Sequence, residues 1–195
     1  MRRRPLVAVV GLVAVAAAAA ALLATHGHAT AAPPTRSAGP LAASSLAARF
    51  AVLRTRHSNR CGMPASALSS MPAHARLRGS CCFPMDYRAY VKQRRELARR
   101  YTSVDVIPND PYDIPVSLAV RLVRYRSIRL TPAQQRIYTR AKPLSTTRGP
   151  CCCPCWRWTA FGGQAKYLIT RQHYSAKQIG DVWSAEEGCG GPAGS

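Results

Sequence analysis

The sequence predicts a single all-α domain in which long irregular loops join the helices. Apolar side chains recur at helical spacing in several segments, and two of these segments begin with helix-capping residues. No stretch alternates apolar and polar residues with the period of two that a half-buried strand requires. Eight cysteines are expected to cross-link this irregular helical domain or to organise it around a metal.

The first 31 residues predict a secretory signal peptide. Arg2, Arg3 and Arg4 precede a run of 19 residues without a polar side chain, Leu6–Ala24. The small-residue sequence Ala29-Thr30-Ala31 follows where cleavage is expected. The alternative is a retained N-terminal membrane anchor, because 19 residues nearly span a bilayer core of about 30 Å. Both outcomes export the chain, and the cleaved form is expected to have no transmembrane segment.

The rest of the chain divides by composition. A stretch rich in Pro, Gly, Ala and Ser precedes the first helical pattern, and glycines end the last one. We therefore expect, in order, a flexible linker at 32–44, a cysteine-rich helical domain at 45–191 and a short tail at 192–195.

The first three helices of this domain are expected at 45–56, 86–101 and 116–125. Apolar stripes at helical spacing predict the first two, and Pro115 favours the start of the third. Residues 57–84 are interrupted by glycines and prolines and are expected to be irregular.

The last three helices follow after Thr131. Thr131 is an N-cap before a proline at the first helical position, which predicts a helix over 131–141. Residues 156–172 have an apolar stripe, although the pair Gly162-Gly163 is unusual inside a helix. Ser175 begins a capping box for a final short helix.

The cysteines fall at three places along the chain. They are Cys61, the pair Cys81-Cys82, and a C-terminal set of Cys151, Cys152, Cys153, Cys155 and Cys189. Adjacent Cα atoms lie about 3.8 Å apart, whereas an unstrained disulfide needs about 4.4 Å or more. Neighbouring cysteines are therefore not expected to bond each other. We expect the partners of Cys81 and Cys82 in the C-terminal set, with Cys189 returning to the same place.

Two of three open interpretations concern disulfide chemistry. Structural disulfides fit export and the even number of cysteines, and each would contribute about 3–4 kcal/mol. They do not explain why four thiols occupy five consecutive positions. Thiol–disulfide exchange is suggested by Cys152-Cys153-Pro154-Cys155, a C-x-P-C sequence before a predicted helix, although no βαβ pattern surrounds it.

The third interpretation is a metal site for copper or zinc. Cys152-x-x-Cys155 has the spacing of chelates for zinc and soft metals. The predicted ligands are all eight thiols: Cys61, Cys81, Cys82, Cys151, Cys152, Cys153, Cys155 and Cys189. Because Cu(I) also favours thioether and imidazole ligands, weaker candidates are His57, Met63, His74 and Met85.

Several cysteine-containing segments resemble an uncharacterised group of exported bacterial cysteine-rich proteins. The resemblance rests on His57-Ser58-Asn59-x-Cys61, Gly79-Ser80-Cys81-Cys82-x-Pro84-Met85-Asp86, Asp110-Pro111-Tyr112-Asp113-Ile114-Pro115, Cys151-Cys152-Cys153-x-Cys155-Trp156-Arg157-Trp158 and Gly188-Cys189-Gly190-Gly191. The cluster at 151–155 is also distantly similar to small exported PCYCGC-motif proteins, from which it differs in the order of its residues. The resemblance implies export and brings no activity with it.

The charge of the chain predicts an anionic partner. The formal charge is +20, and removal of residues 1–31 takes three arginines and leaves +17. Lys92, Arg94-Arg95 and Arg99-Arg100 place cations on one predicted helix, a surface suited to an anionic cell envelope. Nucleic acid is not expected as a partner, because export separates the chain from it.

No enzymatic motif accompanies these features. The sequence has neither a Gly-rich phosphate loop nor HExxH, and we interpret His173 as a surface residue. Trp156, Trp158 and Trp183 are expected to shield the sulfurs. We expect an exported protein that binds or handles copper or zinc. A disulfide-stapled interaction module is the alternative, and a thiol oxidoreductase is the third hypothesis.

Overall fold

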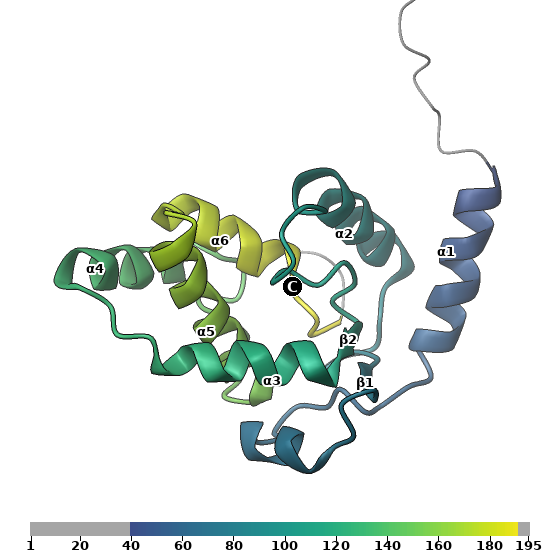
Figure 1. The fold of residues 1–195 in the computed structure, drawn as a ribbon. Helices are drawn as coiled ribbons and strands as arrows, with labels where there is room; N and C mark the ends of the chain where they lie inside the picture. Colours follow the sequence, from purple (N-terminus) through teal and green to yellow (C-terminus); the bar gives the residue numbers. More distant parts are fainter. Residues whose placement is uncertain (1–39, 191–195) are drawn as a thin grey trace, which may run out of the picture. The chain divides into compact units, whose positions relative to one another are not determined.

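A computed structural model describes residues 40–190, with residues 40–44 described by their backbone alone (Figure 1). The expected signal peptide at 1–31 and the tail at 192–195 lie outside the described residues, as do residues 32–39 of the expected linker. All of the described residues belong to one compact unit.

Helices make up most of the described chain, as the sequence predicts. The α-helices are α1 (Pro40–Leu53), α2 (Tyr87–Arg100), α3 (Val116–Arg124), α4 (Pro132–Ala141), α5 (Trp156–Arg171) and α6 (Ala176–Ala185). Short 3₁₀ turns lie at η1 (Ala65–Ser70), η2 (Tyr125–Ser127) and η3 (Lys142–Leu144). Two strands, β1 (Arg76–Arg78) and β2 (Asp113–Pro115), complete the fold.

Local capping chemistry sets where three of the helices begin. Thr131 and Ser175 each form a reciprocal capping box with a glutamine at the third helical position of α4 and α6. Asp86 caps α2 by accepting a hydrogen bond of 2.7 Å from the backbone amide of Ala89. These contacts lie within a few residues of each other in the chain, and so the sequence reveals them.

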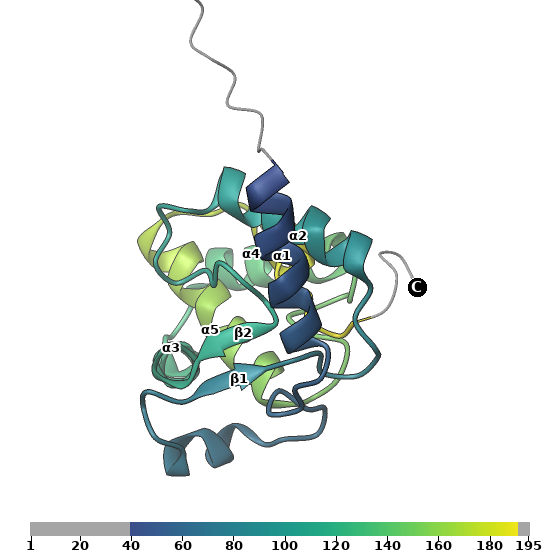
Figure 2. The same ribbon diagram turned by 90° about the vertical axis from the view of Figure 1, so that its right-hand side faces the viewer.

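The helix α1 begins earlier than expected, at Pro40 rather than Ser45, and thus includes residues of the expected linker. Its C-terminal half packs against α2 through a small apolar cluster built on Leu53, Tyr90 and Tyr112. Figure 2 shows α1 in front of α2, the helix that it contacts.

The prediction of an entirely helical fold is wrong where β1 and β2 pair antiparallel. Leu77 is opposite Ile114 in this sheet, and both side chains are fully buried. Each strand has three residues, which is too short for an alternating pattern to be recognised in the sequence. The fold is therefore mainly helical with a small two-stranded sheet.

The helix α5 is the centre of the main core. Ten of its 16 residues are buried, and it contacts α3, α4, α6 and the turns η1 and η2 (Figure 1). Gly163, the second glycine of the pair Gly162-Gly163, lies in the helix interior because the neighbouring helix α3 comes very close. A Cβ atom on Gly163 would lie 2.1 Å from the carbonyl oxygen of Leu122. Gly163 has a low helix propensity, but the close packing of α5 against α3 requires a glycine at this position.

The described helices include none with the length and apolar character needed to span a membrane.

Candidate metal centre

The fold brings the cysteines together from four separate segments. Cys61 follows α1, Cys81-Cys82 follow β1, residues 151–155 precede α5, and Cys189 follows α6. The expectation that Cys81 and Cys82 meet the C-terminal cysteines is confirmed by short sulfur–sulfur distances. Each segment is a loop anchored to a regular element, so the sulfurs are held by the surrounding fold.

Backbone hydrogen bonds align three of these segments side by side. The amide of Cys61 donates to the carbonyl of Cys81 over 2.8 Å, and the amide of Cys81 donates to that of Gly188 over 2.8 Å. The amide of Cys82 in turn donates to the carbonyl of Cys189 over 3.1 Å. This pairing fixes the positions of four cysteines without using their side chains.

Gly190 allows the C-terminal segment to lie against the loop of Cys81 and Cys82. Its φ angle is +82°, and a Cβ atom at this position would lie 2.0 Å from the carbonyl oxygen of Phe83. Only glycine satisfies both conditions, since a side chain would clash and would strain the backbone.

The Sγ atoms form three overlapping groups in which all ligand atoms lie within 4.8 Å of one another. Group A contains Cys61, Cys81, Cys82 and Cys153; group B contains Cys81, Cys151, Cys153 and Cys155; group C contains Cys82, Cys152 and Cys189. All eight predicted thiol ligands belong to at least one group. These groups could hold metal ions.

The distances within the groups suit metal coordination. The Sγ atom of Cys155 lies 3.9 Å from that of Cys81 and 3.9 Å from that of Cys151. The Sγ atom of Cys82 lies 3.4 Å from that of Cys152 and 4.0 Å from that of Cys153. Two sulfurs that bind one tetrahedral zinc ion at about 2.3 Å are about 3.8 Å apart. The described thiols are all free, and the Sγ atoms of Cys61 and Cys153, which are 2.8 Å apart, lie closer together than two sulfurs on one zinc ion would.

Burial differs strongly among the cysteines. Cys81, Cys151, Cys155 and Cys189 are buried, Cys82 and Cys153 are half-buried, and Cys61 and Cys152 are exposed. Groups A and C each contain one exposed thiol, whereas group B contains none. The cluster thus has a buried part and two accessible edges.

The buried thiols interact too strongly to ionise independently. The pKa of Cys151 is lowered, chiefly because Cys155 donates a hydrogen bond to its sulfur, with Cys189 and Cys81 as further donors. The pKa values of these three neighbours are raised, chiefly because each is the donor toward Cys151. Several thiolates can coexist at such distances when a cation compensates their charge.

The C-x-P-C sequence does not have the properties of an exchange-active dithiol. Burial raises the pKa of Cys152 to about 12 and also raises that of Cys153, whereas a reactive thiol needs a lowered pKa. Cys61 is exposed, and its pKa is lowered chiefly by its hydrogen-bonding interaction with Cys153, but it lies outside the C-x-P-C sequence. The raised pKa values of Cys152 and Cys153 therefore do not support the oxidoreductase hypothesis.

The weaker ligand candidates do not join the thiols. His57 and His74 are exposed, and neither is part of a ligand group in the described chain. Met63 packs against the main core, and Met85 packs against the apolar cluster between α1 and α2. The two thioethers complete apolar packing, and so the ligand set that the structure assembles consists of thiols.

Arg157 is a feature of the site that the sequence analysis missed. Its side chain is only 1% exposed, and its guanidinium donates to the carbonyls of Pro111 over 2.8 Å and Glu186 over 2.6 Å. It also lies 4.7 Å from the ring centre of Phe161. Its positive charge favours the thiolate forms of Cys81 and Cys151. The sequence Trp-Arg-Trp beside four cysteines was the signal that could have indicated a buried cation.

The tryptophans have separate roles. Trp158 packs against the cysteines, as expected of a residue that shields sulfur. Trp156 and Trp183 are buried in the main core. The indole of Trp156 donates to Asn59 over 3.2 Å and thereby ties the start of α5 to the loop that contains Cys61.

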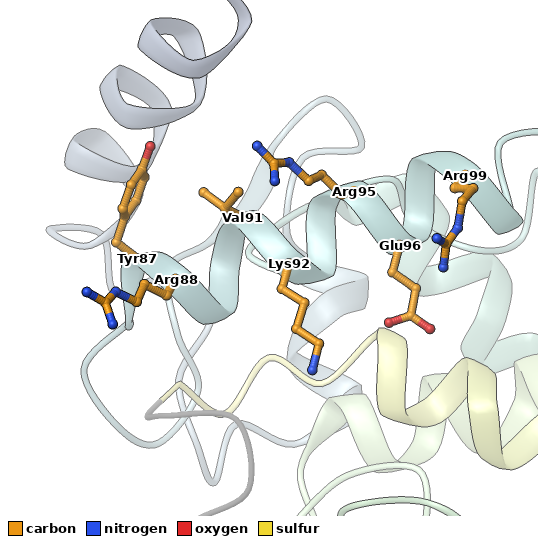
Figure 3. Close-up of a pocket in the computed structure, with 7 residues that line it drawn as sticks. All are labelled: Tyr87, Arg88, Val91, Lys92, Arg95, Glu96 and Arg99. Atoms are coloured by element: carbon orange, nitrogen blue, oxygen red, sulfur yellow. The ribbon is translucent and has the colours of Figure 1, made fainter. Parts of the chain in front are cut away.

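The expected basic surface lies partly on α2. Figure 3 shows a hollow along this helix, lined by Tyr87, Arg88, Val91, Lys92, Arg95, Glu96 and Arg99. The lining thus has four cations and one carboxylate among the described residues. Arg94 and Arg100 point elsewhere, because Arg94 lies 3.6 Å from Asp110 and Arg100 pairs with Asp181 over 3.0 Å.

Comparison of the chain with protein-family models, with curated proteins and with solved structures finds no match.

Proposed function

We propose that the protein binds a soft or borderline transition metal, copper or zinc, through its clustered cysteines and holds or delivers that metal outside the cytosol. The observation that carries the proposal is the convergence of eight thiols from four segments into overlapping ligand groups. Thiolates are preferred ligands of both Cu(I) and zinc. These groups contain no histidine in the described chain, and Met63 and Met85 pack against apolar clusters, which favours an all-thiolate site.

The distribution of distances supports metal binding over a set of disulfides. Cys155 is equally far from Cys81 and Cys151, and Cys82 is close to both Cys152 and Cys153. A sulfur in a disulfide has one partner, whereas a sulfur bound to a metal ion has several sulfur neighbours at similar distances. The close packing of thiols is thus explained by a shared cation.

A disulfide-stapled interaction module is the second candidate. The observation that favours it is the 2.8 Å separation of the Sγ atoms of Cys61 and Cys153. This distance is shorter than the separations of 3.4 to 4.0 Å described above for the other cysteine pairs. Oxidation of this pair alone would leave group C intact.

Export and an anionic envelope partner belong to the same proposal. The N-terminal pattern at 1–31 supports export, and the four cations along α2 support attraction to a negatively charged surface. A metal carrier outside the cytosol encounters oxidants. Burial of four of its thiols would slow their oxidation.

The test is a zinc and Cu(I) competition titration of the full mature chain, purified under anaerobic conditions. The variant Cys152→Ser, Cys155→Ser removes one thiol from group B and one from group C, and we expect its affinity to fall by at least tenfold. The control is His74→Ala, since His74 is exposed and lies outside the groups. Equal affinity of the cysteine variant and the wild type would refute the proposal.

A further inference from the structure

We infer that the cysteines hold a polynuclear cluster of three metal ions, in which Cys81, Cys82 and Cys153 each bridge two ions. This inference rests on the proposed function and specifies the form in which the metal is bound. The ions concerned have a filled d shell, Cu(I) or Zn(II), because these are the ions that all-thiolate sites of this size accommodate.

The overlap of the groups carries the inference. Cys81 and Cys153 belong to both group A and group B, and Cys82 belongs to both group A and group C. One ion in each group would use eleven ligand positions, but the chain supplies eight thiols. The three shared cysteines account for the difference if each of them binds two ions.

A single ion would leave the cluster incompletely used. An ion in group B alone would leave four thiols without metal: Cys61, Cys82, Cys152 and Cys189. Their Sγ atoms nevertheless lie close enough to other cysteine sulfurs to share a metal ion with them. Cys189 is buried as well, although it lies outside group B. Three ions without bridging sulfurs would need eleven thiols for these groups, and the chain has eight.

Charge also favours more than one ion. Each thiol that becomes a ligand releases its proton to the solvent, because only the thiolate binds metal. Eight thiolates would concentrate a large negative charge in a site where several sulfurs are buried. Three divalent ions, together with the buried guanidinium of Arg157, would compensate most of that charge.

Differences in exposure predict how the three ions exchange. Group A and group C each end in an exposed thiol, Cys61 and Cys152 respectively, and group C offers three ligands and so leaves one position open on a zinc ion. Group B has no exposed thiol. We expect a chelator to remove the ions of groups A and C first and the ion of group B last.

The test is native mass spectrometry of the mature full-length chain after anaerobic loading with Zn(II), with a parallel sample loaded with Cu(I). We expect three zinc ions and about eight released protons per chain, and at least three ions of Cu(I), which needs fewer ligands. X-ray absorption of the wild-type protein should contain a metal–metal scattering path, which needs no variant and is therefore independent of folding effects.

Two matched substitutions distinguish a bridge from a terminal ligand. Cys82→Ser removes a ligand shared by groups A and C, and we expect loss of two zinc ions, whereas Cys152→Ser affects group C and should lose one. One zinc ion per wild-type chain, or no metal–metal path, would overturn the inference while the proposed function stands. A chain that binds no metal at all would overturn both.

Discussion

Replacement of Glu186 by glutamine should change how the stability of the protein depends on pH. Glu186 is fully buried just after α6, where its Oε1 atom accepts a 2.5 Å hydrogen bond from Gln164. Its Oε2 atom has no partner among the described residues. Burial raises the pKa of this carboxyl group to about 8, although the hydrogen bond from Gln164 and the charge of Arg157 oppose that rise.

The raised pKa has a definite consequence for stability. Between pH 5.5 and pH 7.5 the carboxyl group is protonated in the folded protein and ionised in the unfolded chain, so the folded state binds more protons. The free energy of unfolding then falls as pH rises, by about 1.4 kcal/mol per pH unit for one proton. From pH 5.5 to pH 7.5 the ionisation of Glu186 should lower the free energy of unfolding of the wild type by roughly 2–3 kcal/mol. The Glu186→Gln variant has a neutral amide at this position and should not show this decrease.

Urea unfolding of both proteins at pH 5.5 and pH 7.5 measures this difference. A chelator and a thiol reductant should be present, because metal binding is itself dependent on pH. The variant Glu187→Gln is the control, since it changes the neighbouring carboxylate and should keep the pH dependence of the wild type. If Glu186→Gln loses as much stability as the wild type over this interval, the carboxyl group is not protonated in the folded protein and the reasoning is wrong.

Three further predictions concern packing, an ion-pair network and the metal. Gly163→Ala should lower the free energy of unfolding by about 1–2 kcal/mol, because the severe contact with the backbone of Leu122 costs about 2–3 kcal/mol and the gain in helix propensity offsets about 1 kcal/mol. An unchanged urea midpoint would mean that α3 and α5 separate freely. Asp113→Asn should lower the free energy of unfolding by about 2 kcal/mol, because the buried carboxylate pairs with Arg49 at 2.7 Å and with Arg76 at 2.5 Å. Loss of a fully buried pair would cost more, but these arginines are 40% and 36% exposed. A decrease of less than about 0.5 kcal/mol would contradict this prediction. Zinc at about 1,000 times its dissociation constant should raise the free energy of unfolding by about 4 kcal/mol and the Tm by about 8–16 °C. A chelator should reverse the increase, and an unchanged Tm would contradict a metal-bound folded state.

The parts of the fold that the sequence predicts are those that depend on neighbouring residues. The predicted N-cap at Thr131 and the predicted capping box at Ser175 act within a single helical turn, and the corresponding helices are present. The strands β1 and β2 escaped prediction because their stabilisation comes from pairing Leu77 with Ile114, far away in the chain. Gly163 was unfavourable for a helix on propensity alone, and the reason for a glycine there is the close approach of the α3 backbone, which the local sequence does not reveal.

The sequence also predicted which cysteines come together in the site, but it did not predict the contacts among them. The rule that adjacent cysteines cannot easily bond each other led to the correct expectation that Cys81 and Cys82 lie near the C-terminal set, although the described thiols are free and no cross-link is confirmed. Which thiols are shared, and the burial of Arg157 beside them, depend on contacts between segments that are more than twenty residues apart. The weaker candidates failed for a similar reason, because Met63 and Met85 face separate apolar clusters.

The central claim is that clustered thiols bind metal, and the intact mass of the mature protein from its own compartment tests it most directly. The sample is measured under native conditions and again after denaturation with a chelator. We predict a native mass that includes copper or zinc and, after the metal is removed, eight thiols that react with an alkylating reagent. A metal-free native mass with no reactive thiols would show that the cysteines are disulfides and would contradict the account.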